Sequence, residues 1–341
     1  IIGSGSAGSI LATRLSQDSN HSILLVEAGP DYPDFDHLPD DLKYGYGTSF
    51  GVQATAGDGG RHDWDFAAKT GSGSRIQRVP RGKVVGGSSA INAQIFLRGI
   101  PEDYDSWASA GNSKWSFEEV LPYLRKLESD VDFQSDFHGS DGPIIARRFS
   151  RDEWLDAHQA FYESCRASGF PDCPDHNDPD SSGVGALAFN NPGGIRISTA
   201  IGYLNQARHR LNLTIRPDCM AHRILFDGRK ASGVVVGSGG EVFTVTGREI
   251  ILSAGAIGSP HLLLLSGVGP SSNLRDVGLP VVADLPGVGQ NLRDHMKLGI
   301  TWNAKEEFSQ RLEDPRFQVA LRYTAQGSNL RNDMKICMWT F

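Results

Sequence analysis

The sequence predicts an α/β fold with a doubly wound, largely parallel sheet, and three observations support that prediction. Residues 1–29 follow the order strand, glycine-rich turn, amphipathic helix and strand. Residues 23–26 (ILLV) and 249–252 (EIIL) are short, mostly apolar runs, typical of strands buried on both faces of a parallel sheet. Residues 213–245 contain short apolar runs separated by turn residues, which predicts an additional antiparallel element.

Length and composition indicate a folded protein of roughly two domains. The chain has 341 residues, and 33 Lys and Arg against 40 Asp and Glu give a net charge of −7. This charge argues against a protein that coats nucleic acid or an anionic membrane. No apolar run reaches the roughly 20 residues that span a bilayer. The four cysteines are dispersed without a CxxC pair, which argues against a zinc ribbon or a disulfide-dense secreted scaffold. A reducing compartment, with the cytoplasm favoured, fits this pattern, and one or two disulfides stay open as an alternative.

The first 80 residues predict one compact unit and one excursion. Residues 1–2 end a strand, and residues 3–8 (GSGSAG) form a turn. Apolar side chains then recur at helical spacing up to Leu15, and residues 23–26 follow as a strand. Residues 30–80 are rich in Gly, Asp, Pro and Ser without sustained periodicity, so we expect a functional excursion there.

Helices and strands alternate in the remainder of the chain. Residues 116–128 predict a helix, because Ser116 suits an N-cap and acidic residues occupy the first turn. Residues 151–168 predict a second helix whose buried face runs from Trp154 to Cys165, with Gly169 as its stop. The further expected elements are strands at 213–215, 224–226, 234–236, 241–245 and 249–252, a helix ending at Leu265, and strands with one helix within 299–341.

The turn at the N-terminus has the spacing of a dinucleotide-binding motif, Gly3-x-Gly5-x-x-Gly8. The first glycine allows the tight turn, the second lets a pyrophosphate approach the backbone, and the third lets helix and strand pack closely. The N-terminus of the following helix favours phosphate. Glu27, 19 positions after Gly8, would accept hydrogen bonds from ribose hydroxyls and repel a 2′-phosphate, which disfavours NADP. The alternative is an ordinary glycine-rich turn.

Two further glycine-rich segments suggest close approach of the backbone to a ligand. Residues 80–92 (PRGKVVGGSSAIN) could lie against a flat ring, since glycine lets the backbone come close. A flexible linker is the alternative, but the interleaved apolar side chains argue against it. Residues 255–269 (GAIGSPHLLLLSGVG) indicate a tight turn and a helix, interpreted as a second crossing of the sheet near the cofactor.

With these segments in view, the sequence resembles the glucose–methanol–choline (GMC) flavoprotein oxidoreductases, in particular their choline and alcohol dehydrogenase-like branch. Residues 82–105 and 255–269 match that family's two signatures. Shorter stretches also match, such as 101–107 (PEDYDSW) and 285–295 (LPGVGQNLRDH). The resemblance covers nearly all of residues 1–297, and it implies a family member truncated at both ends.

The resemblance implies a bound FAD and assigns residues to it. Those expected around the pyrophosphate are Gly3, Gly5, Ser6, Ala7 and Gly8, and those at the adenosine ribose are Glu27 and Ala28. Those expected along the flavin are Gly87, Ser88, Asn92, Ala93 and Ile95. His222 stands where the family usually has a valine against the adenine, a departure that is tolerable if only its backbone makes contact. Family members with covalent FAD carry a histidine just before the asparagine; Ile91 stands there, so non-covalent FAD is expected.

The resemblance also implies oxidation of the CH–OH group of a choline-like or other primary alcohol. In this family a histidine deprotonates the hydroxyl while hydride passes to flavin N5, so base and acceptor must flank the carbinol carbon. Nothing after residue 297 resembles the part that carries this histidine, so no catalytic residue is assigned and the isolated chain is expected to be inactive. His295 beside Asp294 could act as a base, but a structural loop role is favoured. Other histidines without a partner at informative spacing, for which packing or surface roles are expected, are His138, His176 and His261.

Several alternatives stay open at this stage. The chain could belong to a cyanohydrin lyase that keeps FAD without net redox, or to a non-catalytic module that binds NAD, because the glycine turn and Glu27 suit both dinucleotides. The electron acceptor could be oxygen or a quinone-like compound, and the sequence does not indicate an oligomeric state.

The resemblance finally implies a division into two interleaved domains. The FAD-binding domain is expected at 1–145, with the flavin loop, and at 206–297. An antiparallel-sheet substrate domain is expected at 146–205 and 298–341, and its last part would be incomplete. The complete fold expectation is therefore α/β, and α+β in part, with a Rossmann-like FAD-binding domain.

Overall fold

The computed structural model describes residues 1–45, 60–69, 76–303, 305, 308, 311 and 314–340. It divides into two compact units, each made of several chain segments. The first contains residues 1–39, 57–91 and 198–301, and the second contains residues 40–56, 92–197 and 302–341. These structural units differ from the domains expected from the sequence mainly over residues 92–145. The sequence analysis grouped those residues with the FAD-binding domain, whereas the structure places them in the second unit. Because compact packing does not by itself assign a function, the expected domain boundaries stay a prediction.

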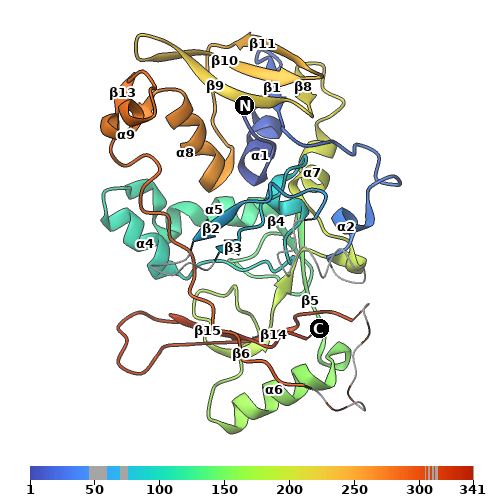
Figure 1. Cartoon of the computed structure of the whole chain (residues 1–341). Coiled ribbons are helices and arrows are strands. Elements are labelled where there is room, and N and C mark those ends of the chain that lie inside the picture. Colours follow the sequence, from blue (N-terminus) through green and yellow to red (C-terminus); the bar gives the residue numbers. More distant parts are fainter. Residues whose placement is uncertain are drawn as a thin grey trace. The chain divides into compact units, whose positions relative to one another are not determined.

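The parallel sheet predicted for the N-terminus lies in the first unit (Figure 1). β1 (Ile23–Val26) pairs in parallel with β8 (Leu213–Arg216), from Ile23 opposite Leu213 to Val26 opposite Arg216. Ile2 forms parallel bridges to both Val26 and Leu252 and extends this sheet on the other side. The α/β fold class expected from the sequence is confirmed.

Both faces of this sheet are covered, as its apolar strands require. On one face, Leu25 packs with Ala12 of α1 (Ser6–Leu15) and with Leu204. On the other face, Val26 and Ile2 pack with Leu262 of α8 (Gly255–Leu265) and with side chains of an antiparallel sheet. Leu25 and Val26, which are successive residues of β1, therefore point to opposite faces of the sheet. The packing of Ala12 against Leu25 places α1 on one of these faces.

The antiparallel element predicted between 213 and 245 is a three-stranded sheet with β10 at its centre. Its strands are β9 (Met220–Asp227), β10 (Lys230–Ser238) and β11 (Glu241–Thr246). Lys230 opposite Asp227 closes the first hairpin, with Gly228 at a φ of 58° in the turn. The remaining elements of the first unit are β2 (Ala67–Lys69), β3 (Ile76–Arg78), η1 (Gly87–Ala90), α7 (Thr199–Gly202), η5 (Leu204–Gln206), β12 (Val268–Gly269), α9 (Ser271–Asp276) and β13 (Ala283–Asp284).

The second unit contains two three-stranded sheets, in the orders β15-β14-β6 and β4-β5-β7. The strands are β4 (Glu128–Asp130), β5 (Ile144–Arg148), β6 (Gly183–Ala186), β7 (Ala188–Phe189), β14 (Val319–Tyr323) and β15 (Met334–Cys337). The helices are α2 (Asp40–Lys43), α4 (Pro101–Ser109), η2 (Ser113–Trp115), α5 (Phe117–Leu127), η3 (Arg151–Glu153), α6 (Asp156–Ala167) and η4 (Pro192–Gly194). Tyr162 and Cys165 of α6 pack with Val184 of β6 and Leu321 of β14, which forms the core of this unit.

The helix predicted at 116–128 is confirmed, and the one at 151–168 is confirmed only in part. Ser116 caps α5, since its Oγ accepts a hydrogen bond from the Glu119 N–H at 3.4 Å. At 151–168 a separate 3₁₀ turn comes first, closed by reciprocal hydrogen bonds between Ser150 and Glu153. Trp154 is extended, so the α-helix begins only at Asp156. The capping box starts the 3₁₀ turn, and the extended backbone at Trp154 and Leu155 ends it, so the helical periodicity is interrupted there.

Two other predicted regions contain less regular secondary structure than expected. The run 249–252 contributes only a bridge at Leu252 and is partly buried. Within 299–341 the described residues form β14 and β15, and the part of this stretch that the structure describes holds no α-helix. Residues 46–59 and 70–75 of the expected excursion lie outside the described residues. No helix in the described part of the chain is long and apolar enough to cross a membrane.

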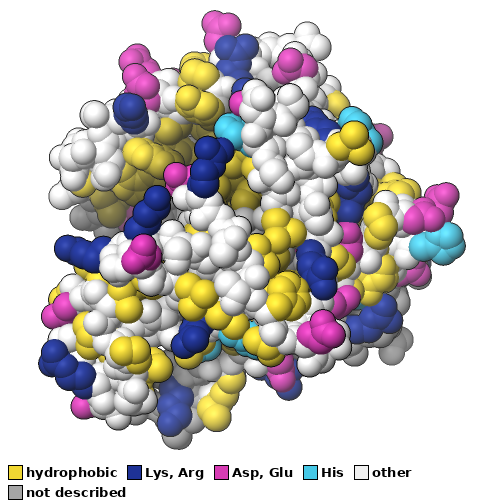
Figure 2. Space-filling view, turned by 90° about the horizontal axis from the view of Figure 1, so that it is seen from above, with side chains coloured by type: hydrophobic (Ala, Val, Ile, Leu, Met, Phe, Trp, Pro, Cys, Tyr) yellow, Lys and Arg dark blue, Asp and Glu magenta, His cyan; other side chains and the backbone are white. Residues whose placement is uncertain are grey.

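The surface matches the modest net charge. On the face shown in Figure 2, Lys and Arg side chains are interspersed with Asp and Glu side chains. Neither sign dominates this face, and the whole sequence carries 33 basic and 40 acidic side chains.

The core of the first unit predicts the cost of one substitution. Leu204 is fully buried between α1 and the sheet, so Leu204→Ala should lower the free energy of unfolding by about 2–5 kcal/mol, measured by urea titration. Leu211→Ala is the matched control, because Leu211 is fully exposed, and it should change stability by less than about 0.5 kcal/mol. Equal effects of the two variants would contradict this packing.

Candidate functional site

The three glycine-rich segments identified in the sequence converge in the first unit on the turn at residues 3–8. Ser253, just before the third segment, donates from its N–H to Ile2 O at 2.9 Å and from its Oγ to Gly3 O at 2.8 Å. Gly86, in the second segment, donates from its N–H to Ser4 O at 3.0 Å. The backbone of the turn is thus held from two sides.

Two of the three glycines of the turn are required by the protein itself. Gly3 has a φ of 92°, and a Cβ on it would lie 2.7 Å from Ser253 O. A Cβ on Gly8 would lie 1.9 Å from Gly3 O, so the helix packs against the strand end at a distance that only glycine allows. These contacts agree with the roles predicted for the first and third glycines.

Gly5 is different, because protein packing does not explain it. It is the N-cap of α1 with φ −66° and ψ −165°, a conformation open to any residue. The only described atom within 4 Å of a Cβ on Gly5 would be Gly87 Cα, at an ordinary 3.9 Å. The described residues therefore leave space beside Gly5, as the dinucleotide interpretation of the second glycine requires.

The N-terminus of α1 offers donors to that space. The first hydrogen bond within the helix runs from the Ser9 N–H to Gly5 O at 3.0 Å. The N–H groups of Ser6, Ala7 and Gly8 precede it and have no acceptor within the helix. Ser6 and Ala7 are exposed, and the first turn of α1 carries no acidic side chain. Positive helix-dipole potential and open N–H groups together suit a phosphate.

Glu27 lies at the carboxyl end of β1, beside the turn. Its Oε2 accepts from the N–H and Oγ of Ser4, both at 2.9 Å, and its Oε1 accepts from the Gly29 N–H at 3.1 Å. Burial raises the pKa of Glu27, while these hydrogen bonds oppose the shift. Protein donors therefore fix the orientation of this carboxylate beside the turn. Ala28, expected to lie beside the ribose, is half-buried next to Glu27.

The second segment adds Gly87 and Ser88 to the same place. A Cβ on Gly87, whose φ is 53°, would lie 2.6 Å from Gly5 Cα. Ser88 is exposed, and its Oγ accepts from the Gly82 N–H at 3.1 Å. The structure therefore brings Gly87 against the turn that the first motif forms, although more than 70 residues separate them in the sequence.

The remaining residues expected at the flavin belong to the second unit. Asn92 is exposed; its Oδ1 accepts from the Gln94 N–H at 3.0 Å, and its carbonyl accepts from Arg196 Nε at 3.1 Å. Ala93 is half-buried, and Ile95 forms an antiparallel bridge with Phe189 of β7. Asn92 and Ile95 are thus held by contacts within the second unit, and the contact of these three residues with a flavin stays a prediction.

The histidines fall into exposed and buried groups. His222 lies exposed on β9, with its Nε2 against Gly237 of β10, where a Cβ would come within 2.5 Å. His261 is exposed on α8. His295 is exposed, and its backbone N–H, not its ring, donates to Asp294 Oδ1 at 2.8 Å. This contact does not orient the imidazole as a base.

His138 and His176 are both buried in the second unit. His176 Nε2 lies 3.1 Å from Ala320 O, a packing environment that lowers its pKa to about 4, chiefly through burial. His138 lies among carboxylates, which the sequence analysis missed. The available signal was the alternation of Glu128 and Asp130, which places two acids on one face of a strand.

Fold and turn together define the class of this protein: a dinucleotide-binding α/β protein. Comparison with known proteins makes this more specific. A family profile described as GMC oxidoreductase matches residues 1–297. An uncharacterised GMC-type oxidoreductase of Rhodococcus erythropolis is 36% identical over 97% of this chain and 66% of its own length. An oxygen-dependent choline dehydrogenase of Photobacterium profundum is 39% identical over 87% of this chain and 51% of its own length.

The solved structures agree. Pyridoxine 4-oxidase from Mesorbium loti superposes with a TM-score of 0.76 at 32% identity, over 84% of this chain and 54% of that one. An FAD-dependent oxidoreductase from Chaetomium thermophilum gives 0.77 at 30% identity, over 86% of this chain and 51% of that one. The chain belongs to the GMC oxidoreductase family, whose members bind FAD. It spans between half and two thirds of the length of these relatives.

The glycines of the turn predict a contrast in stability between two equal substitutions. Gly8→Ala should lower the free energy of unfolding by about 3 kcal/mol, because its methyl group would overlap the Gly3 carbonyl. Gly5→Ala should cost at most about 1 kcal/mol, since the position is an N-cap with free space. Urea titration of the two variants without cofactor measures both values. A large loss for Gly5→Ala would show that the protein itself requires this glycine.

Proposed function

We propose that this chain binds FAD non-covalently at the turn of residues 3–8 and forms part of an FAD-dependent oxidoreductase acting on the CH–OH group of an alcohol. The observation that supports the proposal most directly is Gly5, a glycine that the described protein atoms do not require, beside the open N-terminus of α1. Membership of the GMC family makes FAD the dinucleotide to expect.

In this proposal each expected residue has a physical task. The pyrophosphate receives N–H groups from Ser6, Ala7 and Gly8, with Gly3 shaping the turn and Gly5 leaving room for it. The carboxylate of Glu27, held in place by Ser4, accepts a ribose hydroxyl, and Ala28 lies beside the ribose. His222 contacts the adenine through its backbone. The residues proposed along the flavin are Gly87, Ser88, Asn92, Ala93 and Ile95.

The reaction proposed for the whole enzyme is removal of a hydride and a proton from a carbinol. Bound FAD would supply the hydride acceptor. This chain's part is to bind and orient the cofactor, and we assign no residue of it as the base. Because the relatives include oxygen-dependent choline dehydrogenases, a choline-like primary alcohol and oxygen as final acceptor are proposed. Ile91 just before Asn92 supports non-covalent attachment, since a histidine would be needed there for the covalent bond.

The visible absorbance spectrum tests the cofactor directly. The purified chain is incubated with FAD, desalted and scanned, and a retained flavin band is expected. Acid precipitation should release the flavin into the supernatant; flavin in the pellet would contradict the non-covalent assignment. A parallel titration with NAD should give no saturable binding, and tight NAD binding without flavin retention would overturn the proposal.

Gly5→Ala also tests where the cofactor binds. Its methyl group would occupy the space proposed for the pyrophosphate, so the Kd for FAD should rise roughly tenfold or more, about 1.4 kcal/mol. Fluorescence titration of FAD measures the Kd, and Leu211→Ala serves as the control that keeps wild-type affinity. Unchanged affinity of Gly5→Ala would place the pyrophosphate elsewhere.

A further inference from the structure

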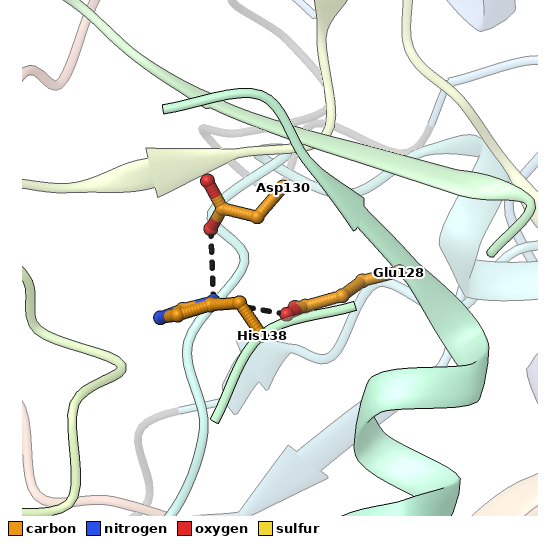
Figure 3. Close-up of side chains that lie close together, drawn as sticks. All are labelled: Glu128, Asp130 and His138. Atoms are coloured by element: carbon orange, nitrogen blue, oxygen red, sulfur yellow. Dashed lines mark hydrogen bonds and ion pairs between the residues drawn. The ribbon is translucent and has the colours of Figure 1, made fainter. Parts of the chain in front are cut away.

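A cluster of six charged side chains lies inside the second unit, whereas the turn that we assign to the cofactor belongs to the first unit. It comprises three carboxylates, two guanidinium groups and one imidazole, all buried: Glu128, Asp130, Asp175, Arg98, Arg148 and His138. Figure 3 shows His138 with the two acids of β4, Glu128 and Asp130. Asp132, which is partly exposed, lies 3.5 Å from Arg148 at the rim.

The imidazole of His138 faces carboxylate oxygens on both sides. Its Nδ1 lies 3.0 Å from Glu128 Oε1 and 3.1 Å from Asp130 Oδ2, and its Nε2 lies 2.9 Å from Asp175 Oδ2. Ionised carboxylates only accept hydrogen bonds, whereas a neutral imidazole has one nitrogen that only accepts. With these carboxylates ionised, both ring nitrogens carry a proton and the ring is an imidazolium.

The charges of the buried groups agree with the same protonation state. Arg98 pairs with Glu128 at 2.5 Å, and Arg148 pairs with Asp130 at 2.9 Å and with Asp175 at 2.5 Å. Two guanidinium groups leave one of three buried carboxylates uncompensated, and the imidazolium supplies the missing charge. Buried charges are costly without such partners.

A metal ion is the alternative occupant, because ligand atoms of Glu128, Asp130 and His138 lie within 4.8 Å of one another. A metal-bound histidine must be neutral at the ligating nitrogen. The carboxylates that such an ion would need are already paired with guanidinium groups, Glu128 with Arg98 at 2.5 Å and Asp130 with Arg148 at 2.9 Å. The geometry favours the proton.

Two chains of contacts lead from His138 to residues 96–98. Along the first, Glu128 binds the Arg98 side chain, which also donates to Phe137 O at 2.6 Å. Along the second, Asp175 Oδ1 accepts from the Asn177 N–H at 3.0 Å. The Asn177 amide then accepts from the Arg98 N–H at 2.9 Å and donates to Phe96 O at 3.0 Å.

We propose that His138 is a positioning residue, an imidazolium that fixes residues 96–98 and, through them, the adjoining residues 92–95 expected to face the flavin. The role rests on the proposed function, since it needs FAD to be the ligand of those residues. His138 itself touches neither cofactor nor substrate in this proposal; it acts through Glu128, Asp175 and Asn177.

The imidazolium also predicts a pH dependence. Burial alone would lower the pKa of His138, but hydrogen bonds to Asp130, Asp175 and Glu128 outweigh it and raise the pKa to about 11. A raised pKa contributes stability that is complete below the unfolded value near 6.5 and is lost as pH rises towards 11. FAD affinity that depends on this cluster should therefore hold through pH 6–9.

The experiment combines nuclear magnetic resonance with FAD titration of the whole chain. In ¹⁵N-histidine-labelled protein, both His138 ring nitrogens should show protonated shifts from pH 6 to 9, assigned by their loss in His138→Gln. His138→Gln should raise the Kd for FAD about tenfold. The matched control is His158→Gln, because His158 is equally buried in the same unit and makes no hydrogen bond through its ring within the described structure. It should change the Kd less than twofold even if it lowers the melting temperature.

Asn177→Ala provides a second test in case His138→Gln does not fold. It removes the link to residues 96 and 98 while leaving the ring between its carboxylates, so the protonated signals should persist and the Kd for FAD should rise several-fold. A neutral His138 ring, or wild-type affinity in the folded His138→Gln or Asn177→Ala variant, would overturn the positioning role. A wild-type chain that retains no FAD would instead contradict the proposed function, and the positioning role would fall with it.

Discussion

The contact between Gly8 and the carbonyl of Gly3 is the constraint on which the rest of the first unit depends. A Cβ at Gly8 would lie 1.9 Å from that oxygen, so helix α1 can approach the strand end only because this residue has no side chain. That approach aims the N-terminus of α1 across the end of the sheet and sets Glu27 beside the turn. Ser253 and Gly86 then fasten the same turn from two distant segments.

The two units hold their functional segments by different physical means. In the first unit, close backbone approach between glycines replaces side-chain contacts, and the donors of α1 stay free for a ligand. In the second unit, residues 96–98 are held by buried charges and by Asn177. The first arrangement gives an anion room to bind, and the second keeps the adjoining segment in place, because breaking one buried pair would leave its partner uncompensated.

Local signals in the sequence predicted much of the first unit correctly. The turn, α1, β1 and the strands between 213 and 246 all follow from short-range patterns, and the structure contains each of them. The helix at 151–168 was predicted too long, because the Ser150–Glu153 capping box closes a separate turn before Asp156. The His138 cluster could not be predicted, since its partners Arg98 and Asp175 lie about 40 residues away on either side and no periodicity links them.

The sequence by itself determined that the chain has the glycine spacing of a dinucleotide-binding turn and resembles the GMC proteins, because glycine spacing and signature motifs are local properties of the chain. Only the tertiary structure distinguished Gly8, which the packing requires, from Gly5, which it does not. Only the structure showed that Gly87 meets Gly5, and that His138 lies between the carboxylates of Glu128, Asp130 and Asp175. Steric space and electrostatic environment depend on atoms brought together from distant segments, and the fold alone determines which atoms those are.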